Sequence, residues 1–235
     1  ICPLQKLIST DGDPSRQKTY HTIYRNAERI LRLINQLMDI RKIDKGQMSL
    51  MFREIDMVAF IQDLCNTFAG QTVNKHISLT FHREDFDTFG LWIDPTNFDK
   101  VILNILSNAF KFTPEGGRVD IYLKSGHSED TETTLSNYAE IIIADTGIGI
   151  APEEIEHIFE RFYQIRNHLN NSNIGTGIGL HLTRSLVELH HGHIHAENNP
   201  EGIGSRFVIR LPMGCSQLKQ EELDNSTDNE LAYTP

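Results

Sequence analysis

The first candidate site is a polar stripe within the otherwise apolar residues 101–112. Asn104, Asn108 and Lys111 are spaced i, i+4 and i+7, so in a helix all three side chains project from one face. The amide oxygen of Asn108 is a neutral ligand that suits Mg²⁺ shared with phosphate oxygens, and the Lys111 ammonium is a point charge for phosphate. The alternative is an ordinary solvated helix face, and this segment alone leaves both interpretations open.

The second candidate is the loop that begins at Asp145, directly after the apolar residues 141–144. Gly147 and Gly149 follow it closely. A carboxylate at the end of a buried strand can accept a hydrogen bond from the amino group of a purine ring, and the glycines let the backbone approach a ligand closely. A turn that needs positive φ angles at its glycines has the same residues, so the loop also has two interpretations.

The third candidate is Gly175-Thr176-Gly177-Ile178-Gly179-Leu180, which precedes a predicted helix. Unpaired N–H groups and the positive end of the helix dipole can cradle phosphate at such a place. The pattern alone is weak. It is no Walker A motif, and the final glycine of a dinucleotide-binding fingerprint is replaced by Thr183.

Hydrophobic periodicity predicts that helices and strands together position these segments. One helix is expected to end near residue 10, and Asp13-Pro14 is a start signal for a long helix over about residues 15–45. Its apolar seam has heptad spacing, which favours a hairpin that dimerises over a helix packed only on its own domain. The seam consists of Ile23, Ala27, Ile30, Ile34 and Leu37. The other predicted elements are strands at 48–52, 77–82, 91–93, 118–124, 139–144, 193–197 and 205–211, and helices at 56–73, 94–112, 152–161 and 178–190.

The composition is that of a globular chain: 39% of the 235 residues are hydrophobic and 23% are charged. The net charge of −10 argues against general nucleic-acid binding, for which a basic face is expected. Three scattered cysteines favour a reducing compartment over a disulfide scaffold. No apolar run is long enough to cross a bilayer. The polar residues 214–235 predict an acidic, disordered linker.

A run of histidines, His190-His191-Gly192-His193-Ile194-His195, raises the question of a metal site. His193 and His195 would share one face of a strand. Because no cysteine or carboxylate cluster accompanies them, structural or solvent-exposed histidines are the favoured interpretation.

The order of the segments carries more information than any one of them. After the asparagine helix and the Asp145 loop come Phe159-Glu160-Arg161-Phe162-Tyr163, the glycine run and Gly202-Ile203-Gly204-Ser205. This order resembles the N, G1, F, G2 and G3 boxes in the ATP-binding domain of sensor histidine kinases, a family shared with gyrase, the Hsp90 chaperones and MutL. Residues 1–46 resemble part of the dimerisation and phosphotransfer hairpin of hybrid two-component sensors from Bacteroides-type bacteria.

The resemblance implies an α+β fold of the Bergerat type, in which a mixed sheet packs on helices, preceded by a long helix of a helical hairpin. It divides the chain into a partial hairpin at 1–46, an ATP-binding catalytic domain at 47–213 and the linker at 214–235.

The resemblance also implies roles for single residues. Asp145 would bind the adenine amino group beside Gly147 and Gly149, Asn108 would hold Mg²⁺, and Asn104 would support it. The remaining implied nucleotide-binding residues are Lys111, Phe162, Gly175, Thr176, Gly177, Gly179 and Leu180. Residues 160–176 would form a lid, latched by Phe159 and Phe162. Because Arg206 stands where many members have Thr, no adenine contact is expected there.

The phosphoryl-accepting histidine of the family is followed by Glu and, a few residues later, by Pro. None of the 11 histidines has that context, and His21 is followed by Thr22. The chain, which begins with Ile1, is therefore expected to be a fragment that binds Mg-ATP without phosphorylating itself. Its parent, a membrane-anchored sensor with its kinase core in the cytoplasm, would phosphorylate an upstream histidine. The phosphoryl group would then pass to an aspartate of a response-regulator receiver.

The expected partners are a second copy of the chain, paired through the hairpin, and a receiver domain; no nucleic acid is expected. Two alternatives stay open. The chain could be an ATP-gated conformational ATPase of the gyrase, Hsp90 or MutL kind, or a degenerate nucleotide-binding module that has lost catalysis. The preceding heptad hairpin and the short lid argue against the first, and the complete set of motif residues argues against the second.

Overall fold

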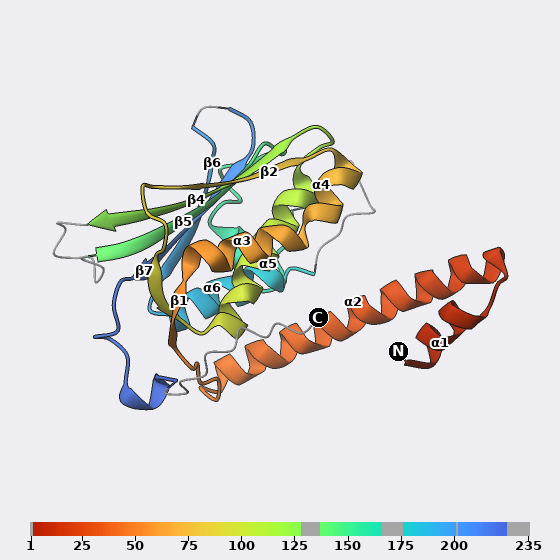
Figure 1. Cartoon of the computed structure of the whole chain (residues 1–235), viewed down its shortest axis with the longest axis horizontal. Coiled ribbons are helices and arrows are strands. Elements are labelled where there is room, and N and C mark those ends of the chain that lie inside the picture. Colours follow the sequence, from red (N-terminus) through yellow and green to blue (C-terminus); the bar gives the residue numbers. More distant parts are fainter. Residues whose placement is uncertain (1, 128–136, 166–175, 201, 225–235) are drawn as a thin grey trace.

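The computed structural model describes residues 2–127, 137–165, 176–200 and 202–224. Figure 1 labels the helices and strands in chain order. The helices are α1 (Cys2–Thr10), α2 (Pro14–Asp44), α3 (Met57–Thr67), α4 (Ala69–Lys75), α5 (Pro95–Phe112) and α6 (Gly179–Leu189), with 3₁₀ turns η1 (His157–Phe159) and η2 (Gln220–Glu222). The strands are β1 (Arg53–Asp56), β2 (Ser78–Arg83), β3 (Gly90–Ile93), β4 (Arg118–His127), β5 (Asn137–Asp145), β6 (His193–Asn198) and β7 (Ser205–Pro212).

The main sheet has five strands in the order β2-β4-β5-β7-β6. The β2–β4 pair is parallel and the other pairs are antiparallel, so the sheet is mixed. Helices α3, α5 and α6 pack on one side of it (Figure 1). Alternate strand residues and the apolar stripe of α5 fill the space between the two layers, as their periodicities require. The predicted α+β fold, a mixed sheet on helices after a long helix, is confirmed.

Helix α2 extends away from this body, and α1 folds back along its far end (Figure 1). Asp13 begins α2 as predicted: its carboxylate accepts hydrogen bonds from the N–H groups of Ser15 and Arg16, and Pro14 occupies the first turn. Only Ile40 is buried along α2. The large residues of the heptad seam are exposed: Ile23, Ile30, Ile34 and Leu37.

Two ion pairs and one buried side chain fasten the end of α2 to the body. Lys100 of α5 lies 2.9 Å from Asp39, and Arg161 lies 2.6 Å from Asp44. Ile40, which lies between Asp39 and Asp44 in the chain, is buried in the core. None of the described helices is both long enough and apolar enough to cross a membrane.

Three predicted elements differ from the structure. The strand predicted at 48–52 is replaced by β1, which pairs with β3; Leu50 and Phe52 are apolar because they are buried anchors beside that pair. The helix predicted at 56–73 breaks at Phe68, whose N–H closes a tighter turn on the Cys65 carbonyl while its ring stacks on Phe110. The helix predicted at 152–161 consists of turns and η1.

The prediction of disorder for 214–235 is wrong for residues 214–224. After β7 the chain forms turns and η2 and then pairs with the segment before β1. The N–H of Phe52 donates to the Glu222 carbonyl (2.7 Å), and the N–H of Asp224 donates to the Phe52 carbonyl (2.8 Å). Polar composition did not reveal this order because backbone groups make the contact. Residues 225–235 lie outside the description.

The partly buried carboxyl group of Asp99 on α5 lowers the stability of the fold when it is ionised. One of its carboxylate oxygens is buried without a hydrogen-bond partner among the described residues. Burial raises the pKa of Asp99 to about 6, so the folded chain holds this proton more tightly than the unfolded chain. The ionised form therefore costs stability once the pH rises through that value.

Replacing Asp99 by Asn should remove this cost. We expect the free energy of unfolding to rise by about 1–2 kcal/mol near pH 8, after allowing for solvent screening, and to change little near pH 4, where the native carboxyl is neutral. Denaturant titrations at the two pH values measure the difference. An equal effect at both would show that the charge of Asp99 is not the cause.

Candidate nucleotide-binding site

The polar stripe of α5 exists as predicted, but its members have different surroundings. Asn104 is engaged by the fold, because its amide Nδ2 donates to Thr183 Oγ1 of α6 (2.9 Å). A Cβ at Gly179, the first residue of α6, would lie only 2.4 Å from Asn104 Oδ1, so α5 and α6 approach closely there. Asn104 thus fixes the junction of the two helices.

Asn108 lies one turn further along α5 and is half-buried. Within the described part of the chain its side-chain amide makes no hydrogen bond, so both its polar atoms remain available. Lys111, another turn on, is half-buried beside the Phe112 ring. Burial lowers the pKa of Lys111, and the charge of Arg29 on α2 lowers it further. A nearby anion would offset both effects.

Asp145 ends β5 with a buried carboxylate. One oxygen accepts the Gly147 N–H (2.7 Å) and the other accepts the Ser205 hydroxyl (2.7 Å). Burial raises the pKa of Asp145, while these hydrogen bonds act in the opposite direction. The Ser205 N–H adds a longer contact to the first oxygen (3.5 Å), and these three hydrogen bonds leave a lone pair on the carboxylate for a further donor.

The sequence analysis named Ser205 as part of the Gly202-Ile203-Gly204-Ser205 segment but gave it no role in binding. The register of β5 and β7 pairs Ala144 with Arg206, which brings the next residue, Ser205, opposite Asp145. Strand pairing therefore selects Ser205 as the partner of the carboxylate. The Gly204-Ser205 pair was the available signal.

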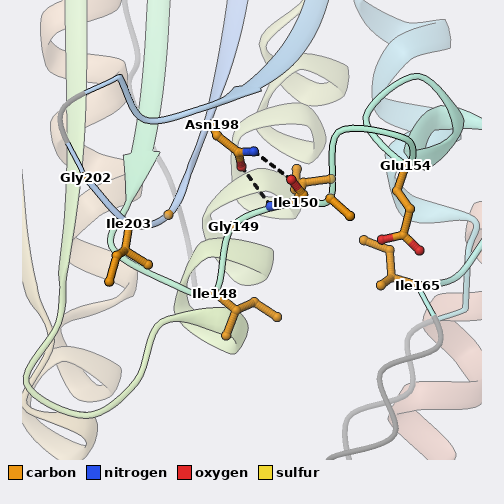
Figure 2. A pocket seen from close by; sticks show the side chains of 10 residues that line it. Ile148, Gly149, Ile150, Glu154, Ile165, Asn198, Gly202 and Ile203 are labelled. Atoms are coloured by element: carbon orange, nitrogen blue, oxygen red, sulfur yellow. Dashed lines mark hydrogen bonds between the residues drawn. The ribbon is translucent and has the colours of Figure 1, made fainter.

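A cavity of about 580 Å³ is lined by the loop that follows Asp145 (Figure 2). Its walls come from the Asp145 loop, the end of β6, the loop before β7 and one residue after η1. They consist of Ile148, Gly149, Ile150, Ala151, Glu154, Ile165, Asn198, Gly202, Ile203 and Gly204. The volume is typical of small-molecule sites. Asn108, Lys111 and the buried Asp145 side chain are not among the lining residues, so the cavity corresponds to one part of the predicted site.

The predicted phosphate cradle is described from Thr176 onward; Gly175 lies outside the described residues. Thr176 Oγ1 accepts the Ile178 N–H at 3.4 Å, and Leu180 packs on the core at the start of α6. Gly177 has a φ of +67°, and a Cβ there would lie 2.5 Å from the backbone of Phe162, so only glycine fits.

The two ends of the predicted lid meet at one backbone contact, since the N–H of Phe162 donates to the Gly177 carbonyl (2.8 Å). The predicted latch is not formed in this structure. Phe159 is buried against Phe207, whereas the Phe162 side chain is 59% exposed and has a positive φ of 66°. Phe159 is therefore a core residue, packed on Phe207 of β7.

The histidine run does not gather into a metal site. His190 is buried: its Nδ1 donates to the Leu186 carbonyl (2.7 Å), and its Nε2 accepts the Asp94 N–H (3.2 Å). Burial lowers the pKa of His190, in keeping with a neutral ring. Across residues 2–127, 137–165, 176–200 and 202–224, no three His, Cys, Asp or Glu side chains are grouped to hold a metal ion.

Comparison with known proteins places this geometry in context. Residues 93–214 match the model of the family described as "Histidine kinase-, DNA gyrase B-, and HSP90-like ATPase". Histidine kinase P4 of Formosa agariphila is 34% identical over 94% of the chain, which spans only 16% of that protein's length.

Two solved structures share the fold. Full-length ShkA in complex with AMPPNP superimposes with a TM-score of 0.71 at 20% identity, over 90% of this chain and 42% of that one. Histidine kinase ThkA in complex with the response regulator TrrA gives a TM-score of 0.61 at 21% identity, over 90% of this chain and 55% of that one.

Proposed function

Because the chain belongs to the histidine kinase-, DNA gyrase B- and HSP90-like ATPase family, we propose that its residues 47–213 form an ATP-binding catalytic domain of a sensor histidine kinase. One observation carries the proposal: the loop that follows a buried carboxylate, held by Gly147 and Ser205, lines a cavity of about 580 Å³. In this proposal Asp145 accepts a hydrogen bond from the adenine amino group, and Gly149 lines the pocket for the ring.

The face of α5 and the start of α6 would hold the phosphates of the bound nucleotide. Lys111 contributes charge to the phosphates, and Thr176, Gly177, Gly179 and Leu180 place backbone N–H groups around them. Asn104 holds these two helices together. Gly175 and the Phe162 side chain complete the cradle and lid in this proposal.

Asn108 is the proposed Mg²⁺ ligand. Its amide oxygen is a hard donor, half-buried and without a competing hydrogen bond among the described residues, which fits Mg²⁺ bound also by phosphate oxygens. When bound, the ion would neutralise charge on the transferring phosphoryl group. The protein's own contribution is to hold donor and acceptor groups in position.

The longer protein's activity and partners are also proposals, since the chain spans about a sixth of the length of histidine kinase P4. We place phosphoryl transfer on a histidine that precedes this segment and then on an aspartate of a receiver domain, as the ThkA complex with a response regulator encourages. The exposed seam of α2 fits a homodimer. A cytoplasmic kinase core on a membrane-anchored sensor completes the proposal.

Calorimetry of the chain with Mg-ADP and Mg-GDP tests the binding proposal. We expect saturable ADP binding and much weaker GDP binding, because a carboxylate matches the amino group of adenine and opposes the carbonyl oxygen of guanine. Equal affinity for both, or none for ADP, would contradict the proposal. For the longer protein, a phosphoryl label that is labile to acid and stable to base would identify phosphohistidine.

Replacing Asn108 by Ala should remove the effect of Mg²⁺ on nucleotide binding. In the unaltered chain we expect Mg²⁺ to strengthen ATP binding, and in the variant we expect that gain to fall by about 1–2 kcal/mol because one oxygen ligand is lost. Calorimetry with and without EDTA measures it. Ser107→Ala, at the exposed neighbouring position on α5, is the control. An undiminished Mg²⁺ effect in the Asn108 variant would refute the assignment.

A further inference from the structure

Two adjacent asparagines at the end of β6 hold the loop that follows β5 at both of its ends. Asn199 Nδ2 donates to the Asp145 carbonyl (2.6 Å), where the loop begins. At the other end, Asn198 Oδ1 accepts the Ile150 N–H (2.8 Å) and its Nδ2 donates to the Ile150 carbonyl (2.7 Å). Figure 2 shows this pair of hydrogen bonds at the rim of the cavity.

The Asn198 contact is specific to an amide of this length. The planar amide of Asn198 presents an acceptor to the Ile150 N–H and a donor to the Ile150 carbonyl. The backbone of a neighbouring strand would form the same two hydrogen bonds. A carboxylate supplies the acceptor and no donor, and an alanine supplies neither. Thr146, at the start of the loop, also bonds to Arg118. Beyond it, Gly147 and Gly149 add no side-chain packing of their own, so the far end of the loop depends on the Asn198 contacts.

Asn199 also holds the opposite wall of the cavity. Its side-chain Nδ2 reaches the Ile203 carbonyl (3.2 Å), and its backbone N–H donates to the Gly204 carbonyl (3.0 Å). Both Ile203 and Gly204 line the cavity. The asparagine pair is thus bonded to both walls, and the cavity's width depends on it.

We propose that Asn198 and Asn199 are positioning residues for the base of the bound nucleotide. They fix the distance between the wall formed by the Asp145–Ile150 loop and the opposite wall formed by Gly202, Ile203 and Gly204. The inference rests on the proposed function, because it takes the adenine ring as the ligand of this cavity. Neither residue needs to touch the phosphates, so their effect falls on recognition of the base.

Three variants test the role with Mg-ADP in calorimetry. Asn198→Ala should weaken ADP binding by about tenfold, since two hydrogen bonds to partly exposed groups are lost. Asn199→Ala should weaken it at least as much, because its contacts to Asp145 are less exposed. Asn137→Ala removes an equally exposed asparagine side chain, bonded to His127 at the far end of β5, and should leave the affinity unchanged.

Asn198→Asp gives a readout that general destabilisation would not mimic. Near pH 4, around the ordinary pKa of an aspartate, a protonated Asp side chain can still accept from the Ile150 N–H and donate to its carbonyl, whereas near pH 8 the carboxylate opposes that carbonyl. The ratio of variant to unaltered dissociation constants should therefore rise from about two to about ten across this range. The charged groups around the site, Asp145, Glu154, Glu197 and the Arg206 paired with Glu197, are the same in both proteins, so the ratio isolates the substituted side chain.

The outcomes separate the two proposals. If the unaltered chain binds ADP and Asn198→Ala binds it within about twofold, or if the Asn198→Asp ratio is flat with pH, the positioning role is wrong and the proposed function stands. If the unaltered chain binds no ADP, the proposed function fails first. Thermal unfolding of each variant confirms that a weakened affinity belongs to a folded protein.

Discussion

Replacing Asp145 by Asn is expected to weaken ADP binding by about 1–3 kcal/mol, which is roughly a 5- to 150-fold rise in the dissociation constant. The proposed adenine amino group would lose a charged acceptor and meet a side chain that is half donor. Calorimetry with Mg-ADP measures the change.

The fold should survive this substitution, which makes the loss of affinity interpretable. The Asn oxygen can still accept the Gly147 N–H, and the Ser205 hydroxyl can reverse its role and accept from the new amide. Burial raises the pKa of Asp145, which means that its charge is held at a cost, so removing the charge should not lower the thermal stability.

Asp120→Asn is the matched control for this experiment. Asp120 is also buried in the sheet, but its carboxylate pairs with His82 and Arg118. As a neighbour of Val119, which pairs with Asp145, it projects from the opposite face of the sheet. The Asp120 variant should lose stability and keep its ADP affinity. Unchanged affinity in Asp145→Asn, or an equal loss in both variants, would contradict the proposed base recognition.

Gly204→Ala should have the largest effect of any single methyl group added to the site. Gly204 has a φ of +112°, and a Cβ there would lie 1.9 Å from the Asp145 carbonyl oxygen. The backbone must move, and Asp145, Ser205 and the cavity wall must move with it. We expect a loss of about 2–4 kcal/mol in the free energy of unfolding and of more than about 1.4 kcal/mol in ADP affinity.

The control lies two residues away in the same loop. An added Cβ at Gly202 meets nothing within 4 Å. Gly202→Ala should therefore change stability by less than about 0.5 kcal/mol. Denaturant unfolding and calorimetry on both variants test the contrast. Similar results for the two substitutions would show that close approach of Gly204 to Asp145 does not hold the site together.

The parts of the fold that sequence predicted well are those fixed by local signals. Helix α5, predicted at 94–112, begins at Pro95 because the Asp94 carboxylate accepts the Asn97 N–H and caps the first turn. The same holds for α2 and its Asp13 cap. Strands β4, β5 and β7 were located by their apolar runs, since each must bury residues against the helices.

What sequence could not supply are contacts decided by distant strands and by backbone groups. Ser205 meets Asp145 only through the register of β5 and β7. Asn198 and Asn199 form hydrogen bonds with backbone carbonyl and N–H groups. Such groups are common to nearly all residues, so no sequence motif identifies these two asparagines. The wrong prediction of a strand at 48–52 also concerns contacts that sequence does not show. Leu50 and Phe52 are buried alternately, as in a strand, but the pairing of β1 with β3 begins only at Arg53.

The pairing of Phe52 with Leu223 has a mechanical consequence. The segment before β1 and the segment after β7 meet there through two backbone hydrogen bonds. A displacement of either segment would therefore have to break these bonds or move the other segment with it.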